Sequence, residues 1–361
     1  KIPFLDLRIT DKGERDRLIA AVDRVFAHGR IVLGPEVEEL EKRVASQCGL
    51  KYAVGVNSGT DALILGLKSL GIGSGDEVIT TSLSWIATAN AITLTGAKPV
   101  FADIQNDLNI DPNSIKKLIN SKTKAIMPVH YTGKVCNMTD IMRIVDEHEL
   151  LLIEDACQAF NAKHHNKSAG SFGNVGCFSM NPMKVFPACG EAGMVVTDHY
   201  ETYERLNSLR YNGTINKEKC IEPSHNGRID TIQAAILLER LSGVDGMIKK
   251  RCQLASFYNS KLDKIVRIPK QADGEEDVYY TYTIQTDNRD QLKLFLEERG
   301  IETKIQHPYL MPLQEPYSGS SRCDIKIAKK IVNRILCLPC HEKMSEDDAD
   351  YVATCVKQFF N

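Results

Sequence analysis

The sequence predicts an α/β protein in which a large N-terminal unit holds a mixed, mostly parallel, doubly wound sheet and a smaller C-terminal unit is α+β. The first observation is an alternation of helix-like and β-rich runs over residues 37–197. The second is that runs such as 151–156 are almost continuously apolar, as buried central strands are. The third is a change of pattern after the long helical stretch that begins near residue 241. We therefore expect a large domain at 1–240 and a small domain at 241–361.

The elements of the large unit follow in order along the chain. A first helical pattern, "GERDRLIAAVDRVFAHG", precedes the alternation, and we expect it to pack back on the small unit. The alternation itself then reads "VEELEKRVASQCG", "YAVGV", "GTDALILGLKSLG", "EVITTS", "ATANAITLTG", "KPVFADI", "PNSIKKLINSK", "KAIMPV", "DIMRIVDEHE", "LLIEDA", "CFSM" and "GMVVT". Strands that alternate with helices in this way indicate a parallel sheet with helices on both faces.

The small unit is predicted from four patterns. A long helix, "GMIKKRCQLASFYNSKLDK", leads into the strand "VYYTYTIQT", the helix "QLKLFLEERGI" and a final helix "DDADYVATCVKQFF". The pair in "CLPC" has the spacing of a metal knuckle or a redox motif, but no second pair or histidine set completes a tetrahedral site. We therefore assign this stretch to a buried strand and expect no metal.

Composition limits the classes of partner. The 361 residues include 43% apolar and 25% charged residues, and the formal net charge is −2. Such a chain has no long-range field that would gather nucleic acid or an anionic membrane, so we expect a small-molecule partner. Eleven scattered cysteines fit reduced thiols, and no run is long and apolar enough to span a bilayer. These features predict a cytoplasmic protein.

In doubly wound sheets, ligands bind beyond the carboxyl ends of the strands, and the first polar cluster at such an end is "VGVNSGTDAL". Gly59 and Thr60 there begin a helix, where backbone N–H groups and the helix dipole favour a phosphate. Ser58 and Thr60 add hydroxyl donors. An ordinary N-cap supported by Asp61 explains the same residues equally well.

Three further clusters follow later strands. Trp85, the only tryptophan, comes after "EVIT", where it either caps the core or stacks on a planar ligand. Glu154 and Asp155 end the strand "LLIEDA", where a carboxylate must be paired or hydrogen-bonded. Lys184 follows "GCFSM" within an apolar run, where it either reaches solvent or is held for chemistry, and Ser179 lies just before it.

Together, the four clusters contain the groups that pyridoxal 5′-phosphate requires of a protein. The cofactor needs donors for its phosphate, a surface on which its ring stacks, an anion at the pyridine nitrogen and an amine for a Schiff base. No single cluster points to it alone. Their combination at successive strand ends of one sheet does.

The chain also resembles the sugar aminotransferases of the DegT/DnrJ/EryC1/StrS group, within the fold-type I aminotransferase superfamily. The matching motifs cover nearly the whole sequence, namely "IPFLDL", "GPEVEELEKRVA", "NSGTDAL", "GDEVIT", "GAKPVFADI", "IEDACQAF", "GSFGNVGCFSM", "GEAGMVVTD", "RIDTIQAA" and "LPCHEKMSEDD". The resemblance implies a fold-type I large domain with a small C-terminal domain. It also implies bound pyridoxal phosphate, with pyridoxamine phosphate as the intermediate form.

The resemblance assigns roles to individual residues. Lys184 would bond covalently to the cofactor, Asp155 would pair with its pyridine nitrogen, and both would be catalytic. The remaining cofactor-binding residues would be Trp85 under the ring, Gln158 near the phenolic oxygen, Gly59, Thr60 and Ser179 at the phosphate, and Asn226 reaching that phosphate from the neighbouring subunit. A homodimer with shared active sites is therefore expected. The lysine also distinguishes this chain from related sugar dehydratases, which have histidine at that position.

The implied reaction is transfer of an amino group, from L-glutamate, to a keto group of a nucleotide-linked sugar. Ala192 in "GEAG" and Pro312 in "MPLQEPY" depart from common family patterns, which leaves the sugar open. His307 and Tyr309 lie in a proline-rich loop that either packs or touches substrate. Two alternatives remain: an aminotransferase acting on an aminocyclitol or another small keto or aldehyde acceptor, and a cofactor-binding regulatory protein.

Overall fold

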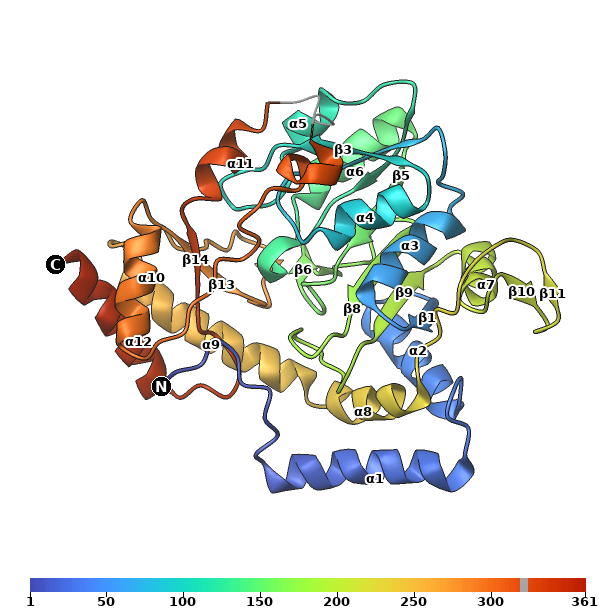
Figure 1. Ribbon diagram of the computed structural model, residues 1–361, viewed down its shortest axis with the longest axis horizontal. Coiled ribbons are helices and arrows are strands. Elements are labelled where there is room, and N and C mark those ends of the chain that lie inside the picture. The colour runs from blue at the N-terminus through green and yellow to red at the C-terminus, as the bar shows by residue number, and fades with distance from the viewer. Residues whose placement is uncertain (319–323) are drawn as a thin grey trace.

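The computed structural model describes residues 1–318 and 324–361. Both chain ends lie on the same side of the molecule, beside helices α10 and α12 (Figure 1). The helices are α1 (Lys12–His28), α2 (Pro35–Gln47), α3 (Gly59–Ser69), α4 (Ala87–Leu94), α5 (Pro112–Lys116), α6 (Met138–His148), α7 (Tyr200–Leu209), α8 (Thr231–Leu241), α9 (Val244–Leu262), α10 (Arg289–Glu298), α11 (Lys326–Ile331) and α12 (Glu346–Phe360). Short 3-10 helices are η1 (Tyr131–Gly133), η2 (Met311–Leu313) and η3 (Glu315–Tyr317).

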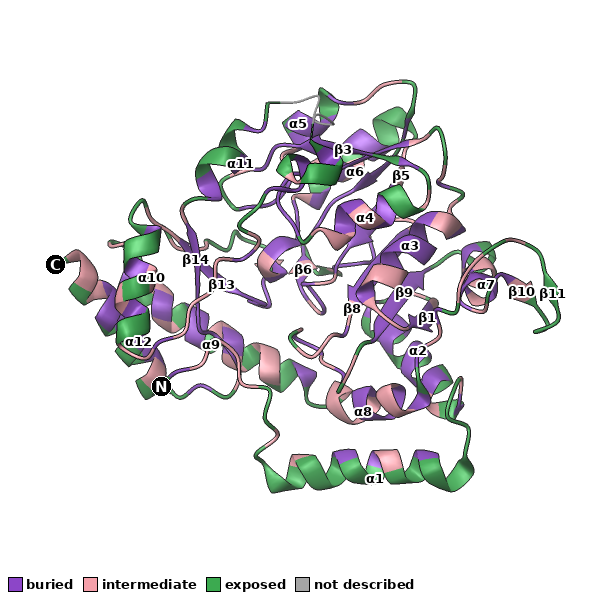
Figure 2. Cartoon of the chain, in the orientation of Figure 1, coloured by how far each residue is buried: buried purple, intermediate pink, exposed green. Residues whose placement is uncertain are grey.

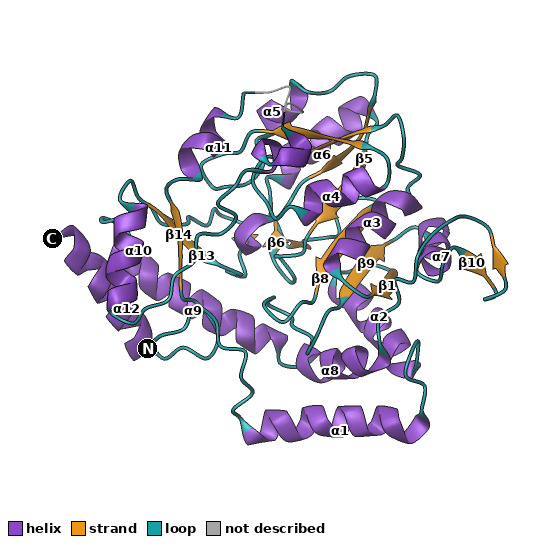
Figure 3. Ribbon diagram, viewed as in Figure 1, coloured by secondary structure: helices purple, strands orange, loops and turns teal. Residues whose placement is uncertain are grey.

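A seven-stranded sheet forms the centre of the molecule, in the order β1-β9-β8-β5-β4-β2-β3 (Figure 3). Its strands are β1 (Tyr52–Val56), β2 (Glu77–Thr81), β3 (Lys98–Ala102), β4 (Thr123–Met127), β5 (Leu151–Asp155), β8 (Val175–Ser179) and β9 (Gly193–Thr197). Neighbours pair in parallel except at β9, which runs antiparallel to both β1 and β8. The predicted mixed, mostly parallel sheet is confirmed.

Helices cover both faces of this sheet, as a doubly wound fold requires. Along β1 the neighbours Ala53 and Val54 enter different hydrophobic cores, because successive side chains of a strand point to opposite faces. Helices α2, α5, α6 and α8 contribute to one core, and α3, α4 and α7 to the other. The strands are therefore buried on both sides (Figure 2), which explains their nearly continuous apolar sequences.

The remaining strands are short. They are β6 (Lys163–His164), β7 (Lys167–Ser168), β10 (Thr214–Ile215), β11 (Lys219–Cys220), β12 (Glu275–Glu276), β13 (Tyr282–Gln285) and β14 (Ile335–Leu338). Strand β13 pairs antiparallel with β14, and this ribbon packs with α9, α10 and α12 around a separate hydrophobic core. The predicted strand at "CLPC" is confirmed for Cys337 and Leu338, which belong to β14, whereas Pro339 and Cys340 follow the end of the strand.

The predicted packing of helix α1 against the small unit is wrong. Its buried residues, Leu18, Ala21 and Val25, form a narrow stripe that meets Ala235 of α8 instead of the small unit. The spacing of the stripe identifies the face but not its partner. Only the segment before the helix joins the small unit, where Ile2 bridges Ile301.

The two units are joined by more than one connection. Helix α9 begins against the core of the sheet at Val244 and ends in the small core at Leu262. Further on, α11 packs back against the large unit, where Ala328 and Ile331 meet Leu83 and Ile104. The boundary after residue 240 stays a prediction. No helix in the described part of the chain is long and apolar enough to cross a membrane.

Candidate active site

A cavity of about 540 Å³ lies at the carboxyl ends of the central strands. Loops and helices that follow β1, β2, β5 and β8 all reach it. Seven of the predicted site residues line it, namely Gly59, Thr60, Trp85, Asp155, Gln158, Ser179 and Lys184. The expected convergence of separate strand ends is therefore present in the tertiary structure.

Lys184 lies in the turn between β8 and β9, and its backbone N–H donates to the carbonyl of Asn181 at 2.8 Å. The side chain is half-buried and lines the cavity. Its Nζ lies 4.5 Å from the centroid of the Tyr280 ring, which is a cation–π distance. The amine is thus held over an aromatic face inside the cavity, and this position explains a lysine in an apolar run.

Asp155 ends β5 with its carboxylate held by two donors. The Thr88 hydroxyl donates to Oδ2 at 2.8 Å and the Cys157 backbone N–H donates to Oδ1 at 3.2 Å. Thr88 is itself 3.1 Å from the Ser84 hydroxyl. Both hydroxyl residues are buried, so the Asp155 carboxylate has a defined orientation within the cavity.

Glu154 points away from the cavity, because neighbouring side chains of a strand alternate between faces. Its Oε2 is 2.9 Å from His130 Nε2 and accepts the Gly170 N–H at 2.8 Å. Its Oε1 accepts the N–H groups of Phe172 and Gly173 at 2.6 and 2.8 Å. The two carboxylates of "LLIEDA" therefore differ in use, since Glu154 fixes a loop and only Asp155 faces the cavity.

The N-terminus of α3 forms a close-packed edge of the cavity. Ser58 is its N-cap and accepts the Asp61 N–H at 3.1 Å, so the ordinary capping explanation holds for Ser58. Gly59 lies so near Ser179 that a Cβ on it would be 2.5 Å from the Ser179 Cβ. Only glycine permits this approach, which brings a serine hydroxyl beside the positive end of a helix. This arrangement fits a phosphate group.

Trp85 stands at the rim of the cavity and does not cap the core. Its side chain is 61% exposed, and its ring centroid is 5.8 Å from that of His307, at an interplanar angle of 35°. An indole that is exposed toward a cavity has a free face for a planar ligand. The donor set, the carboxylate and the amine around it together fit pyridoxal phosphate.

Gln158 is buried at the base of the cavity. Its Oε1 accepts the backbone N–H of Thr132 at 2.9 Å. Asn226, in contrast, is exposed and does not line the cavity of its own chain. Its Oδ1 accepts the Arg228 Nε–H at 2.7 Å. Of the predicted site residues, Asn226 alone is not brought to this cavity.

The cavity also contains residues that the sequence did not single out for the site, including Thr88, Tyr280, Lys304 and Gln306. Tyr280 belongs to "VYYTYTIQT", where alternation of aromatic and polar residues signals a two-sided strand but not what either side faces. His307 does line the cavity, whereas Tyr309 is 74% exposed and lies outside it.

His307 has an unusual environment for a histidine. Burial, together with the nearby Lys184 and Lys304 cations, lowers the pKa of His307 to about 3. The ring is therefore neutral near pH 7. Its Nδ1 lies 3.1 Å from the Tyr131 hydroxyl, so it serves as an uncharged hydrogen-bonding group at the rim.

Comparison with known proteins decides the family. The family model for the DegT/DnrJ/EryC1/StrS aminotransferase family matches residues 12–357. The chain belongs to this family. It is 36% identical over 364 residues to the dTDP-3-amino-3,4,6-trideoxy-alpha-D-glucose transaminase of Streptomyces venezuelae, a match that covers 99% of this chain and 96% of the relative. It is also 34% identical over 366 residues, 99% and 98% of the two chains, to a protein of Geobacillus stearothermophilus named pleiotropic regulatory protein.

Solved structures that are similar to this chain have the same fold. The structure of DesV from S. venezuelae, solved with a ketimine intermediate, matches with a TM-score of 0.96 and 35% identity over 100% of this chain and 99% of that one. NtdA from Bacillus subtilis, solved with its cofactor PMP, matches with a TM-score of 0.93 and 28% identity over 100% and 85% of the two chains. The fold-type I architecture expected from the sequence is confirmed.

Proposed function

We propose that the protein is a pyridoxal-phosphate-dependent aminotransferase that moves an amino group, supplied by L-glutamate, to a keto group of a nucleotide-linked sugar. The observation that carries the proposal is the convergence of Lys184, Asp155 and the Gly59–Ser179 contact in one cavity. Relatives named for dTDP-, UDP- and GDP-linked sugars support this acceptor class. Their names differ in the nucleotide and in the sugar, so the class is proposed and not one substrate.

Different residues of the cavity bind different parts of the cofactor. Gly59, Thr60 and Ser179 bind its phosphate at the N-terminus of α3, and Trp85 covers one face of the ring. Asp155, oriented by Thr88, binds the ring nitrogen and keeps it protonated. When bound, the cofactor supplies an electron sink for the pair of electrons left when a carbon gives up its proton.

Lys184 carries the proton in this scheme. Its free amine would act as the general base and acid, taking the proton from the donor's α-carbon and holding it for return within the cavity. The Tyr280 ring under Nζ holds the amine on one side of the cavity, so that proton removal and return use the same face. The neutral His307 and the Lys304 cation also line the cavity, and we assign them to the polar acceptor.

The dimer is part of this proposal. Asn226 lies outside the cavity of its own chain, on an exposed loop beside Arg228. We place it at the cofactor phosphate of a neighbouring copy, which makes the enzyme a homodimer with shared active sites. We also assign the enzyme to the cytoplasm, because the ten cysteines in the described part of the chain are all free thiols.

Borohydride labelling tests the covalent assignment. The cofactor-loaded protein treated with borohydride should carry the label on Lys184, and Lys184→Ala should lose both the label and about 10²–10⁴-fold of turnover. Lys304→Ala is the matched control, since this second lysine of the cavity should leave the label in place. A label on another lysine, or an active Lys184→Ala enzyme, would refute the assignment.

An acceptor panel tests the substrate class. Amino transfer from L-glutamate, followed by mass spectrometry, should occur with keto sugars linked to a nucleotide and not with aminocyclitol precursors or small keto and aldehyde phosphates. Transfer only to aminocyclitol precursors or to small keto and aldehyde phosphates would favour the alternative aminotransferase, which acts on these acceptors. Bound cofactor without a half-reaction on any amino donor would favour a regulatory protein, the description that one relative carries in its name.

A further inference from the structure

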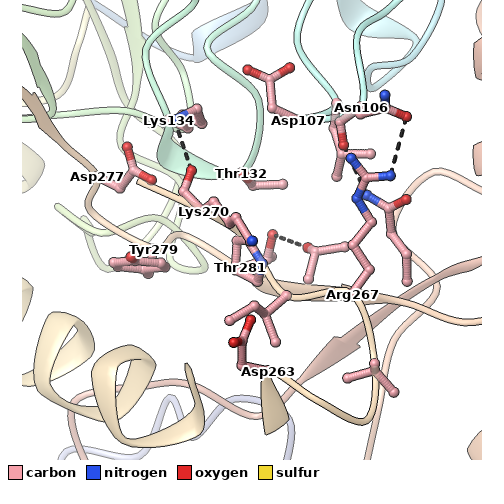
Figure 4. A pocket seen from close by; sticks show the side chains of 16 residues that line it. Asn106, Asp107, Thr132, Lys134, Asp263, Arg267, Lys270, Asp277, Tyr279 and Thr281 are labelled. Atoms are coloured by element: carbon pink, nitrogen blue, oxygen red, sulfur yellow. Dashed lines mark hydrogen bonds between the residues drawn. The ribbon is translucent and has the colours of Figure 1, made fainter. Parts of the chain in front are cut away.

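A second cavity, of about 360 Å³, lies between the two units and shares no lining residue with the first (Figure 4). One wall comes from loops of the large unit around Asp107 and Thr132. The other comes from the segment between Asp263 and Gln285 of the small unit. Its volume falls within the range of about 300–1,000 Å³ typical of small-molecule sites. The family reaction proposed above uses none of its lining residues.

One extended segment faces both cavities. Asp277, Tyr279, Thr281 and the next two alternate residues line the second cavity, whereas Tyr280 lines the first and lies under Lys184. This division follows from the two-residue period of extended chain. It gives the second cavity a wall of one carboxylate and several hydroxyl groups.

Asp277 is the unusual group in this wall. Its side chain is only 6% exposed, and its Oδ1 has no hydrogen-bond partner. Burial raises the pKa of Asp277 to about 7, and the nearby Glu275 and Asp107 carboxylates raise it further, while Lys134 opposes them. A buried carboxylate oxygen without a hydrogen-bond partner is costly, and a native protein retains it where something supplies the missing contact.

Lys134 is not that contact, because its ammonium is bound elsewhere. It forms an ion pair with Glu275 and donates to the carbonyl of Lys270 at 3.2 Å. No ion pair joins it to Asp277 among the described residues. The charge of Lys134 lowers the pKa of Asp277, but no direct contact is made, so the Asp277 carboxylate lines the cavity without a cation bound to it among the described residues.

The opposite end of the cavity is cationic. Arg267 and Lys270 are both exposed, and Figure 4 shows the Arg267 side chain on the far side of the cavity from Asp277, with Lys270 between the two. The Arg267 guanidinium makes only a long contact of 3.4 Å to Asn106 Oδ1. Within residues 1–318 and 324–361, no group of three His, Cys, Asp or Glu side chains is placed to hold a metal ion. An organic ammonium therefore suits Asp277.

We propose that this second cavity binds a small amino acid-like zwitterion, with its ammonium on Asp277 and its carboxylate toward Arg267 and Lys270. The hydroxyl groups of Thr281 and Tyr279 line the space between the two ends. Charge at both ends selects zwitterions over simple amines and simple acids, because each of those leaves one charged end unmatched.

Calorimetry on the borohydride-reduced holoenzyme tests the site. Reduction fixes the cofactor on Lys184, so amines cannot exchange with it in the first cavity. If borohydride does not fix the cofactor on Lys184, that result counts against the proposed function and not against the second site. 4-Aminobutyrate and glycine are the probes, and butyrate and butylamine are the single-charge controls. At least one zwitterion should bind once per chain, and more tightly than either control.

Two variants test whether the measured heat of binding comes from this cavity. Asp277→Asn should weaken zwitterion binding about tenfold or more, because a charge-assisted contact is lost in a buried place. Asp273→Asn, an exposed carboxylate of the same segment, is the matched control and should not change it. If Asp277→Asn fails to fold, Arg267→Gln combined with Lys270→Gln should weaken 4-aminobutyrate and spare butylamine. No zwitterion binding at millimolar concentration, or binding indifferent to these variants, overturns the proposal.

Discussion

The cofactor cavity and the second cavity are each lined by a buried aspartate, but the two aspartates have opposite surroundings. Asp155 is held by a hydroxyl and a backbone N–H, and both donors come from the large unit. Asp277 has an oxygen without any donor, on the extended segment of the small unit that faces both cavities. The Asp155 carboxylate is therefore oriented by the protein before any ligand binds. The Asp277 carboxylate, in contrast, lacks a contact that a bound ligand could supply.

The sharpest test of this contrast replaces the prepared carboxylate. Asp155→Asn should lower turnover about 10²–10³-fold, because a fixed charge opposite the ring nitrogen is lost while the shape is kept. Asp273→Asn removes an exposed carboxylate and should retain turnover. Steady-state rates with the same donor and acceptor measure both. An Asp155→Asn enzyme with nearly normal turnover would mean that the ring nitrogen is held in another way.

The second test concerns stability and its dependence on pH. The pKa of Asp277 is about 7 in the folded chain and about 3.9 in an unfolded one. The stability that the protonated group contributes is therefore complete below about pH 4 and is lost as the pH rises through 7. Between pH 5 and pH 8, the native protein should lose about 2–3 kcal/mol more of its free energy of unfolding than Asp277→Asn does.

Urea unfolding of both holoenzymes at the two pH values measures this difference. The groups that face Asp277, namely Asp107, Glu275 and Lys134, are present in both proteins, so the two profiles differ only through Asp277 and its interaction with these charges. If the free energies of unfolding of the two proteins change in parallel with pH, ionisation of Asp277 does not destabilise the folded protein. The proposed difference between Asp155 and Asp277 would then be wrong. A 4-aminobutyrate ligand should reduce the loss at pH 8 in the native protein only.

A smaller effect is expected from the residue that orients Asp155. Thr88→Val keeps the shape of the side chain but removes the hydrogen bond to Asp155, so turnover should fall about 2- to 10-fold. Thr88→Ser should restore it. The absorbance of bound cofactor as a function of pH separates positioning from folding, because a purely structural role would leave that titration curve unchanged. An unaltered curve with lowered turnover would contradict the positioning role.

The smallest expected effect comes from removing the residue that a neighbouring copy would contribute to the first cavity. Asn226→Ala should weaken cofactor affinity about threefold, because one hydrogen bond from the neighbouring copy is lost. The second cavity is formed within one chain, so zwitterion binding should not change. Equilibrium dialysis of the cofactor and calorimetry of 4-aminobutyrate measure the two. A fully active monomer at high dilution would contradict the shared active site.

Much of the first site was predictable from the sequence, and the reason is the regularity of parallel sheets. Lys184, Asp155, Trp85 and Gly59 each follow a different strand, and the carboxyl ends of such strands meet at one edge. Local order along the chain therefore implies proximity in space. Thr88 was not predicted, although it lies only three positions after Trp85. Its hydroxyl reaches Asp155, 67 positions away in the sequence, through the packing of the first turn of α4, which no local pattern reports.

The sequence by itself determined the order of strands and helices, the chemical groups at the strand ends and, through its motifs, the family. Only the tertiary structure decided that α1 packs on α8, that Asn226 lies outside its own cavity and that one buried oxygen of Asp277 has no hydrogen-bond partner. Periodic patterns report which face of an element is apolar, because that depends on neighbours three or four positions away. Which surface meets that face depends on the packing of distant segments, and no local pattern records it.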